Sequence, residues 1–130
     1  MSGVLLDTTA LIDALRGRAS AGRIVRLRST GDRPYVCAIN VEELLRGVKP
    51  AEEASVAHLL NGLRIAPLGR SQGEQAGLWR RQFAVRGITL SQADCLVAAA
   101  ALGVGARLAT GNPRDFPMGK LVVEHWPSGA

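Results

Sequence analysis

Four acidic residues of this chain lie where a parallel sheet would bring them together. Asp7 ends the first predicted strand, and Glu43 follows the second. Asp94 lies in the first turn of an apolar helix, and Asp115 follows the strand that ends at Thr110. The carboxyl ends of the strands of an open parallel sheet line the crevice where ligands bind. We therefore expect these four carboxylates to converge on one cavity.

Such a cluster has a defined chemistry. Clustered carboxylates repel one another, which raises the pKa of at least one of them unless a cation neutralises the charge. A hard divalent cation takes oxygen ligands, and Mg²⁺ typically binds one or two carboxylates and keeps several waters. A site of this kind activates water and stabilises the pentacoordinate phosphorus formed during hydrolysis. The pattern therefore favours metal-dependent hydrolysis of a phosphodiester bond.

Each acid also has a structural explanation. Asp7 can cap a helix, and Asp115 can serve a turn before Phe116-Pro117. The spacings Asn40-x-x-Glu43 and Ser91-x-x-Asp94 both fit a capping box, in which an acid reaches back to the amide of the cap. Helix starts gather at the same edge of a parallel sheet, so capping remains open for each acid. It does not explain why Asp94 opens so apolar a helix.

Periodicity indicates the elements that must position these acids. Short apolar runs predict strands at residues 4–6, 34–39, 64–68, 106–110 and 121–124. Helical spacing is found between them at 8–15, 21–28, 52–62, 71–87 and 92–102, and after Asn40, the expected cap of a helix closed by Gly47. Strands separated by helices imply βαβ units. We expect an α/β fold, a three-layer α/β/α sandwich with a mainly parallel central sheet.

Length and composition bound the remaining possibilities. At 130 residues the chain predicts a single domain, residues 1–130. Cys37 and Cys95 lie in apolar stretches and are expected to be small buried hydrophobes, although a Cys/His nucleophile remains open. The longest apolar run, 95–106, is shorter than the ~20 residues that span a bilayer. The first seven residues lack a basic region, so we expect no signal peptide and a soluble, cytoplasmic protein.

The charge of the chain is strongly basic. Sixteen basic residues, fourteen of them arginine, give a net charge of +5 and an isoelectric point near 10.2. Arginine presents a planar fork suited to phosphate, and a basic domain favours nucleic-acid binding. The alternative explanation of the many arginines is a genome whose base composition favours arginine codons, with the arginine side chains simply solvated. A basic surface around an acidic pit suits a metal-dependent nuclease, because arginines bind the phosphate backbone while the metal lets the acids face it.

The residues required by other classes of phosphate-handling proteins are missing from this sequence. A haloacid-dehalogenase phosphatase needs an aspartate two places after its nucleophile, whereas Thr9 stands two places after Asp7. A response-regulator receiver needs paired acids after its first strand, an aspartate after the third and a lysine after the fifth, and this chain lacks that set. No G-x-x-x-x-G-K-[ST] phosphate loop is present.

Four motifs in order resemble one family across nearly the whole chain. Residues 4–12 read VLLDTTALI, residues 43–47 read ELLRG, residues 93–101 read ADCLVAAAA, and residues 110–116 read TGNPRDF. The sequence is similar to the PIN-domain family, and specifically to VapC-type toxins of prokaryotic toxin–antitoxin pairs. Each motif alone is weakly specific, but four in order at suitable separations are strongly so.

The resemblance implies an endoribonuclease that depends on Mg²⁺, with Mn²⁺ as an alternative. Asp7 and Asp94 match the acids that hold the metal directly. Glu43, rather than the adjacent Glu42, is followed by the matching leucine and glycine. Glu43 and Asp115 then match the rest of the acidic cluster, as direct or water-mediated ligands that position the attacking water.

The resemblance also assigns roles around these acids. Three residues match groups that orient carboxylates or touch phosphate: Thr8, Thr110 and Asn112. Two positions depart from the family pattern. Thr9 stands where serine is commoner, which keeps a hydroxyl, and Gly111 stands where a polar residue is frequent, which removes a substrate contact.

The partners follow from the same resemblance. We expect a homodimer, a cognate VapB-type antitoxin whose tail lies over the active-site groove, a higher toxin–antitoxin assembly, and no membrane contact. The resemblance also implies that the RNA substrate is tRNA or rRNA and that its cleavage stops translation and growth. A non-catalytic RNA-binding module on the same fold, and a PIN nuclease outside any toxin–antitoxin system, are the alternatives. The candidates for RNA contact are Arg16, Arg18, Arg80, Arg81, Arg86 and Arg114.

Overall fold

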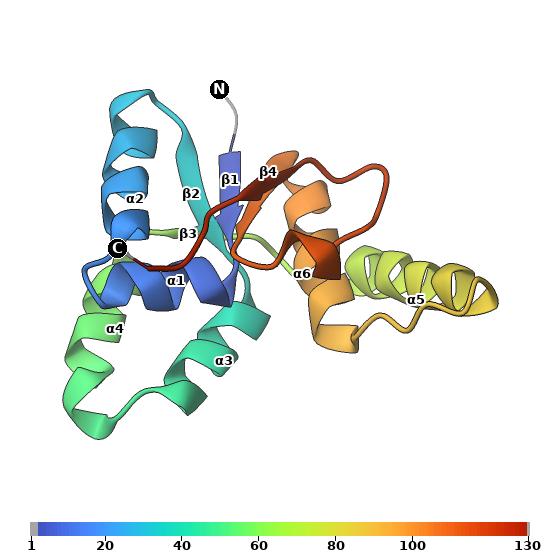
Figure 1. Cartoon of the computed structure of the whole chain (residues 1–130), viewed down its shortest axis with the longest axis horizontal. Coiled ribbons are helices and arrows are strands. Elements are labelled where there is room, and N and C mark those ends of the chain that lie inside the picture. Colours follow the sequence, from blue (N-terminus) through green and yellow to red (C-terminus); the bar gives the residue numbers. More distant parts are fainter. Residues whose placement is uncertain (1–2, 130) are drawn as a thin grey trace.

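The apolar run near the start of the chain forms the centre of a parallel sheet. The computed structural model of the chain, which describes residues 3–129, contains one sheet of five strands (Figure 1). The strands are β1 Gly3–Leu6, β2 Arg33–Val36, β3 Arg64–Ile65, β4 Ala106–Thr110 and β5 Val123–His125. Their order is β3-β2-β1-β4-β5, and each neighbouring pair is parallel.

Helices cover both faces of this sheet. They are α1 Thr8–Leu15, α2 Ala19–Ser29, α3 Ala38–Gly47, α4 Glu53–Asn61, α5 Arg70–Val85 and α6 Gln92–Gly103, with short 3₁₀ turns η1 Pro50–Glu52 and η2 Pro113–Asp115. Figure 1 shows α1 to α4 on one side of the sheet and α5 and α6 on the other. The expected three-layer α/β/α sandwich with a parallel central sheet is confirmed.

The central strand β1 is a continuous apolar run because both of its faces are covered. All four of its residues are buried. Leu5 packs into the core beneath α5 and α6, whereas Val4 and Leu6 pack into the core beneath α1, α2 and α4. Side chains alternate between the faces of a strand, so a strand buried on both faces lacks polar residues. This rigid strand fixes the position of the next residue, Asp7.

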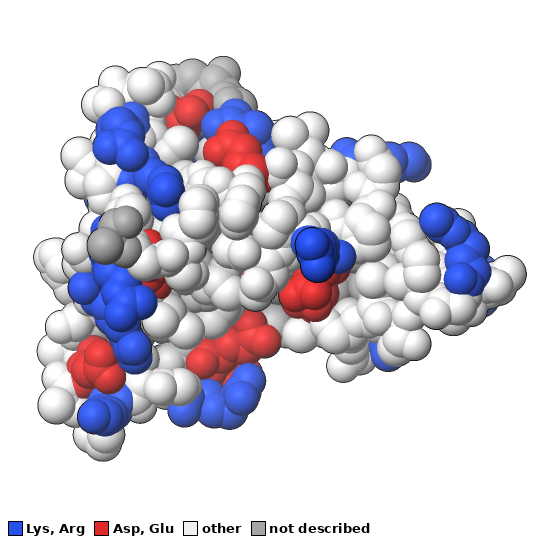
Figure 2. Space-filling view, viewed as in Figure 1, with Lys and Arg blue, Asp and Glu red and all other residues white. Residues whose placement is uncertain are grey.

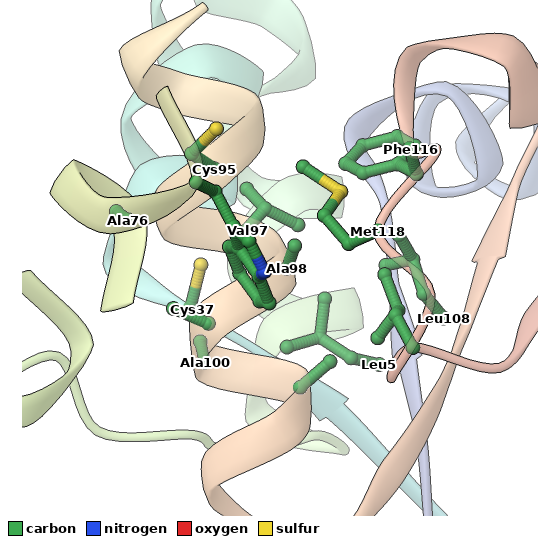
Figure 3. Close-up of a cluster of buried hydrophobic side chains, with 14 of the residues drawn as sticks. Leu5, Cys37, Ala76, Cys95, Val97, Ala98, Ala100, Leu108, Phe116 and Met118 are labelled. Atoms are coloured by element: carbon green, nitrogen blue, oxygen red, sulfur yellow. The ribbon is translucent and has the colours of Figure 1, made fainter. Parts of the chain in front are cut away.

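The helix α6 is apolar because it packs between the sheet and α5. Its buried residues are Cys95, Val97 and Ala98 to Ala101. Figure 3 shows side chains of α6 facing Leu5 and Leu108 of the strands, and Phe116 and Met118 of the segment after β4. The row of alanines lets the helix backbone approach the sheet closely. This packing holds the start of α6, which carries Asp94, at a fixed place beside the sheet.

Both cysteines are free and buried. Burial raises the pKa of the Cys37 thiol and of the Cys95 thiol. A thiol with a raised pKa is seldom in the nucleophilic thiolate form. The expectation of two small buried hydrophobes is confirmed, and the structure does not support a Cys/His nucleophile.

One helix begins earlier than the sequence predicts. The strand expected over 34–39 ends at Val36, and α3 begins at Ala38, so the prediction that Asn40 caps this helix is wrong. Asn40 lies inside the first turn of α3, where its side-chain Oδ1 accepts the backbone N–H of Cys37 at 3.1 Å. This reach-back makes Cys37 the cap of the helix, and Asn40 itself is fully buried.

Two strands are shorter or shifted relative to their predictions. The strand expected over 64–68 is only two residues long in the sheet, because its neighbour β2 ends at Val36 and offers no further pairing partner. The strand expected over 121–124 lies at Val123–His125. Leu121 instead donates its N–H to the carbonyl of Met118 at 3.1 Å, which makes a turn before the strand begins.

Within residues 3–129, no helix combines the length and the apolar character needed to cross a bilayer. The expected absence of a signal peptide concerns residues 1–7. Residues 1 and 2 of that segment lie outside the described part of the chain.

Candidate active site

Asp7 lies where the carboxyl ends of β1 and β4 meet. The register of the two strands pairs Leu6 with Ala109, and the N–H of Asp7 donates to the carbonyl of Ala109 at 2.9 Å. The next residue of β4, Thr110, is therefore beside the Asp7 side chain, and its hydroxyl donates to Asp7 Oδ2 at 2.8 Å. The Asp7 side chain makes no capping hydrogen bond in α1. The capping explanation of Asp7 is thus not supported.

Two hydroxyl groups orient the Asp7 carboxylate. Besides Thr110, the hydroxyl of Thr9 donates to Asp7 Oδ2 at 3.5 Å. Both hydroxyl oxygens also accept a backbone N–H from the loop after β4: Thr9 from Gly111 at 2.9 Å, and Thr110 from Asn112 at 3.0 Å. The loop, the first turn of α1 and the carboxylate therefore form one hydrogen-bonded unit.

Glu43 is held at the same edge by α1. Its Oε1 accepts the hydroxyl of Thr8 at 2.7 Å, and Thr8 Oγ1 in turn accepts the side-chain N–H of Asn40 at 3.3 Å. The capping-box explanation of Glu43 is wrong, because Asn40 is inside the helix and reaches back to Cys37. The adjacent Glu42 is exposed and pairs with Arg46 at 3.0 Å on the outer surface.

Asp94 reaches this edge from the first turn of α6. Ser91 caps the helix as expected, and its Oγ accepts the backbone N–H of Asp94 at 3.0 Å. The carboxylate itself lies half-buried beside the other acids. Burial raises the pKa of Asp94 above the ordinary value, and the negative charges of Asp115 and Glu43 raise it further.

The four acids form an electrostatically coupled set, which we call the acidic group: Asp7, Glu43, Asp94 and Asp115. Burial is the main cause that raises the pKa of Asp7, and the charges of Asp94 and Glu43 add to it. Asp7 is only 7% exposed, whereas Asp115 lies exposed on η2. Like charges that act on one another must lie close together. The four acids therefore lie near one another at the carboxyl edge of the sheet, and that they line one cavity stays a prediction.

Two members of the acidic group, Asp7 and Asp94, are suitable ligands for a hard divalent cation. Within the described residues 3–129, no three His, Cys, Asp or Glu side chains lie close enough to enclose a metal ion by themselves. A Mg²⁺-type ion takes one or two carboxylates and keeps several waters, so it needs no third protein ligand. A cation would also relieve the repulsion that raises the pKa of Asp7 and of Asp94. The donor set therefore fits such an ion.

These pKa shifts predict how stability depends on pH. In EDTA, we expect the free energy of unfolding to fall as the pH rises above 3.8, the ordinary pKa of an aspartate. In this range the folded protein keeps protons on Asp7 and Asp94 that the unfolded chain has already lost, so raising the pH favours unfolding. Urea unfolding over a pH series measures the effect, and Asp7→Asn should flatten the profile. An equally steep profile in that variant would contradict the assignment.

Asn40 and Thr9 support the site in ways that their positions in the sequence do not reveal. Asn40 is fully buried and supports Thr8, but its position before a helical pattern made it look like a cap. Thr9 departs from the family pattern, yet its hydroxyl contacts both Asp7 and the loop. The side chain of Asn112 is exposed, and Asn112 contacts Thr110 through its backbone N–H.

The Gly111 position has a steric explanation. A Cβ at this position would lie 3.2 Å from Ser128 Oγ and 3.3 Å from Thr9 Oγ1. These distances are shorter than ordinary van der Waals contacts, so a larger residue would push against both the tail of the chain and α1. The glycine thus lets the C-terminal segment pack beside the loop that carries the site.

The basic side chains are spread over the surface of the protein. All six arginines named as candidates for RNA contact are exposed. Two also have structural partners: Arg80 Nε donates to the Leu90 carbonyl at 3.0 Å, and the Arg86 guanidinium lies 5.0 Å from the Phe83 ring centre. Figure 2 shows acidic atoms gathered over α3 and near η2, each group beside basic atoms, with further basic atoms over α2 and the far end of α5.

Comparison with known proteins agrees with this arrangement. The PIN domain family model matches residues 4–117. The chain therefore belongs to the PIN domain family, as its four motifs predicted. Ribonuclease VapC19 of Mycobacterium tuberculosis is 30% identical to it over 115 residues, which covers 88% of this chain and 92% of that protein. Ribonuclease VapC10 of the same organism is 31% identical over 116 residues, covering 88% and 86%.

Solved structures share the fold. VapBC2 from Rickettsia felis, bound to a DNA fragment from its promoter, contains a chain with a TM-score of 0.84 and 21% identity, covering 95% of this chain and 98% of that chain. A toxin–antitoxin complex from Klebsiella pneumoniae contains a chain with a TM-score of 0.77 and 24% identity, with the same coverage of 95% and 98%. At these identities the similarity establishes the architecture.

Proposed function

We propose that this chain is the toxin of a type II toxin–antitoxin pair, a Mg²⁺-dependent endoribonuclease that hydrolyses phosphodiester bonds in RNA. The observation that carries the proposal is the mutual electrostatic influence of Asp7, Glu43, Asp94 and Asp115 at the carboxyl edge of the sheet. Membership of the PIN domain family and the two relatives named ribonucleases support it. The proposed nuclease domain is the whole chain, residues 1–130.

Each acid has a distinct task in the proposed mechanism. Asp7 and Asp94 would hold the Mg²⁺ ion, with Mn²⁺ as a substitute, and the ion supplies an activated water and charge neutralisation at the phosphate. Asp7 can do this in one fixed orientation, because the hydroxyls of Thr9 and Thr110 hold its Oδ2. Asp94 is presented by a helix whose buried face leaves it little freedom.

The other two acids position the attacking water. Glu43 keeps its orientation through Thr8, whose hydroxyl donates to Glu43 Oε1 at 2.7 Å. A carboxylate held in this way can accept a hydrogen bond from water and direct its lone pair at phosphorus. Asp115 is more exposed and lies on η2, where RNA reaches it from solvent. The loop residue Asn112 would contact the phosphate through its exposed side chain.

The proposed partners follow from the relatives and from the charge. The R. felis and K. pneumoniae structures are a VapBC assembly and a toxin–antitoxin complex, which supports a VapB-type antitoxin, a homodimer and a higher assembly for this chain. The net charge of +5 supports binding to RNA, for which tRNA or rRNA is proposed. Two free buried cysteines agree with a proposed cytoplasmic location.

The test of this function is the cleavage of total cellular RNA by the purified protein. We expect discrete fragments with Mg²⁺ or Mn²⁺ and none with EDTA, and mapping the fragment ends identifies the target RNA. Expression without a partner should arrest growth, and co-expression of a cognate antitoxin should relieve the arrest. Binding of RNA without cleavage under either metal would favour the non-catalytic module. Cleavage without growth arrest would favour a nuclease outside a toxin–antitoxin pair.

A further inference from the structure

A cavity of about 580 Å³ lies directly beside the acidic group, between the loop after β4 and the end of β5. Its lining residues are Gly111, Asn112, Pro113, Arg114, Asp115 and His125. One of them, Asp115, belongs to the acidic group, so whatever occupies the cavity adjoins the place where we propose that the phosphodiester is cut. The volume lies within the roughly 300–1,000 Å³ typical of small-ligand pockets.

The walls of this cavity are held in place by the fold. The register of the sheet pairs Thr110 with His125, and the N–H of Trp126 donates to the Thr110 carbonyl at 2.8 Å. The histidine is therefore fixed opposite the start of the loop. The loop itself is closed by a backbone bond from Asp115 N–H to the Asn112 carbonyl at 3.0 Å.

The loop is also anchored from below. Phe116 follows η2 and is buried against the core beneath α6 (Figure 3). Its N–H donates to the Pro113 carbonyl at 3.1 Å, which tightens the turn. A pocket built from an anchored loop and the end of a strand exists before a ligand arrives, so binding needs little ordering of the protein.

The lining matches the parts of one nucleotide. Arg114 offers a guanidinium fork for a phosphate. His125 offers a flat ring for stacking and two ring nitrogens for the edge of a base, while Asn112 offers both a donor and an acceptor. Pro113 supplies an apolar surface against a base or sugar. Both Arg114 and His125 are exposed and therefore reachable by RNA.

We propose that this cavity, which we call the β5 subsite, binds one unpaired nucleotide of the RNA next to the scissile phosphate, with His125 and Arg114 as the residues that select it. The proposal rests on the proposed ribonuclease function and adds a substrate feature to it. Bases in an RNA duplex are stacked and paired, so only a nucleotide splayed out of a loop or a single strand can enter such a pocket. Cleavage sites should therefore lie beside unpaired nucleotides.

A second cavity supplies a matched control. It has a volume of about 430 Å³ and lies between α1 and α4, lined by Ala14, Leu15, Ala54, Ser55, His58 and Leu59. It contains a histidine but no arginine, and none of the acidic group lines it. His58→Ala is thus the control for His125→Ala. Arg64 lies exposed on β3, the sheet edge opposite β5, so Arg64→Ala is the control for Arg114→Ala.

The first measurement is RNA binding by variants built on Asp94→Asn, which is expected not to cut its ligand. The probes are short fluorescein-labelled RNA single strands of each base, and a duplex of equal length. We expect His125→Ala and Arg114→Ala each to weaken single-strand binding about 5- to 50-fold, with a smaller effect on the duplex. His125→Ala should also reduce the preference among bases. His58→Ala and Arg64→Ala should leave the affinities unchanged.

The second measurement is cleavage kinetics on the otherwise wild-type protein. We expect both subsite variants to raise KM more than they lower kcat, and Arg114→Lys to recover part of the loss because it keeps the positive charge. Circular dichroism establishes that each variant is folded. If the wild type neither binds nor cuts RNA, the proposed function itself fails. If it does both, and the subsite variants match their controls, the β5 subsite is overturned while the ribonuclease stands.

Discussion

Asp94→Asn is expected to abolish RNA cleavage, by about 100-fold or more, and to leave the fold intact. The substitution keeps the size of the side chain and the backbone N–H that Ser91 accepts, so α6 still begins at the same residue. It removes the charge with which Asp94 would bind the metal ion. The measurement is the rate of cleavage of a defined RNA at saturating Mg²⁺, with metal binding followed separately by calorimetry.

Asp94→Asn should also leave the stability of the metal-free protein unchanged or raise it, whereas an ordinary loss of packing would lower it. Burial and the charges of Asp115 and Glu43 raise the pKa of Asp94, so its ionised form is disfavoured in the metal-free protein. The neutral amide should therefore melt at the same temperature as the wild type in EDTA, or higher. Glu74→Gln, on an exposed glutamate of α5, is the matched control and should cut RNA normally. Wild-type cleavage by Asp94→Asn would refute the site assignment.

Asp13→Ala is expected to destabilise the protein by about 3 kcal/mol without involvement of the active site. Asp13 is buried, with only 2% of its surface exposed. Its two carboxylate oxygens accept the backbone N–H of Ser20 at 2.9 Å and that of Gly129 at 2.8 Å. It thereby caps α2 from α1 and ties the C-terminal segment to both helices. Alanine leaves two backbone donors without their charged acceptor, and urea unfolding measures the loss.

The pH dependence distinguishes Asp13 from the acids of the site. Although burial alone would raise the pKa of Asp13, the hydrogen bonds from Gly129 and Ser20 lower it below 3.8. Its contribution to stability is thus complete above pH 3.8 and is lost as the pH falls through the lowered value. Asp7 acts in the opposite direction and above 3.8. A loss no larger than that of exposed Glu53→Ala would contradict the role of Asp13.

Much of the fold followed from local patterns because the central elements are strongly apolar. The run at 4–6 is buried on both faces, and the alanine-rich α6 is packed on both sides, so tertiary packing agrees with what periodicity alone predicts. The carboxyl edge of the sheet then followed from chain order. Asp7 follows β1, Asp94 lies at the start of α6, and Asp115 follows β4. A parallel sheet brings these three positions to the same edge, whatever the acids do there.

The supporting contacts of the site could not be predicted in the same way. Asn40 has the same preference for helix starts whether it caps a helix or reaches back from within its first turn. Only the tertiary contact with Thr8, 32 residues away, gives it a second role. The length of β3 could not be predicted, because it depends on how far β2 extends beside it. The β5 subsite could not be predicted either, because it needs the register that places His125 opposite the loop.

The order of the strands has a consequence for folding during synthesis on the ribosome. Asp7 emerges from the ribosome early, but Thr110, its partner at 2.8 Å, lies 103 residues later in the chain. At roughly 5–20 residues per second, several seconds pass before β4 can dock beside β1. Throughout that time β1 lacks a neighbour on one edge, and the Asp7 carboxylate lacks the hydroxyl of Thr110. In a nascent chain the acidic group is therefore incomplete, and Asp115 is the last of its four members to be added.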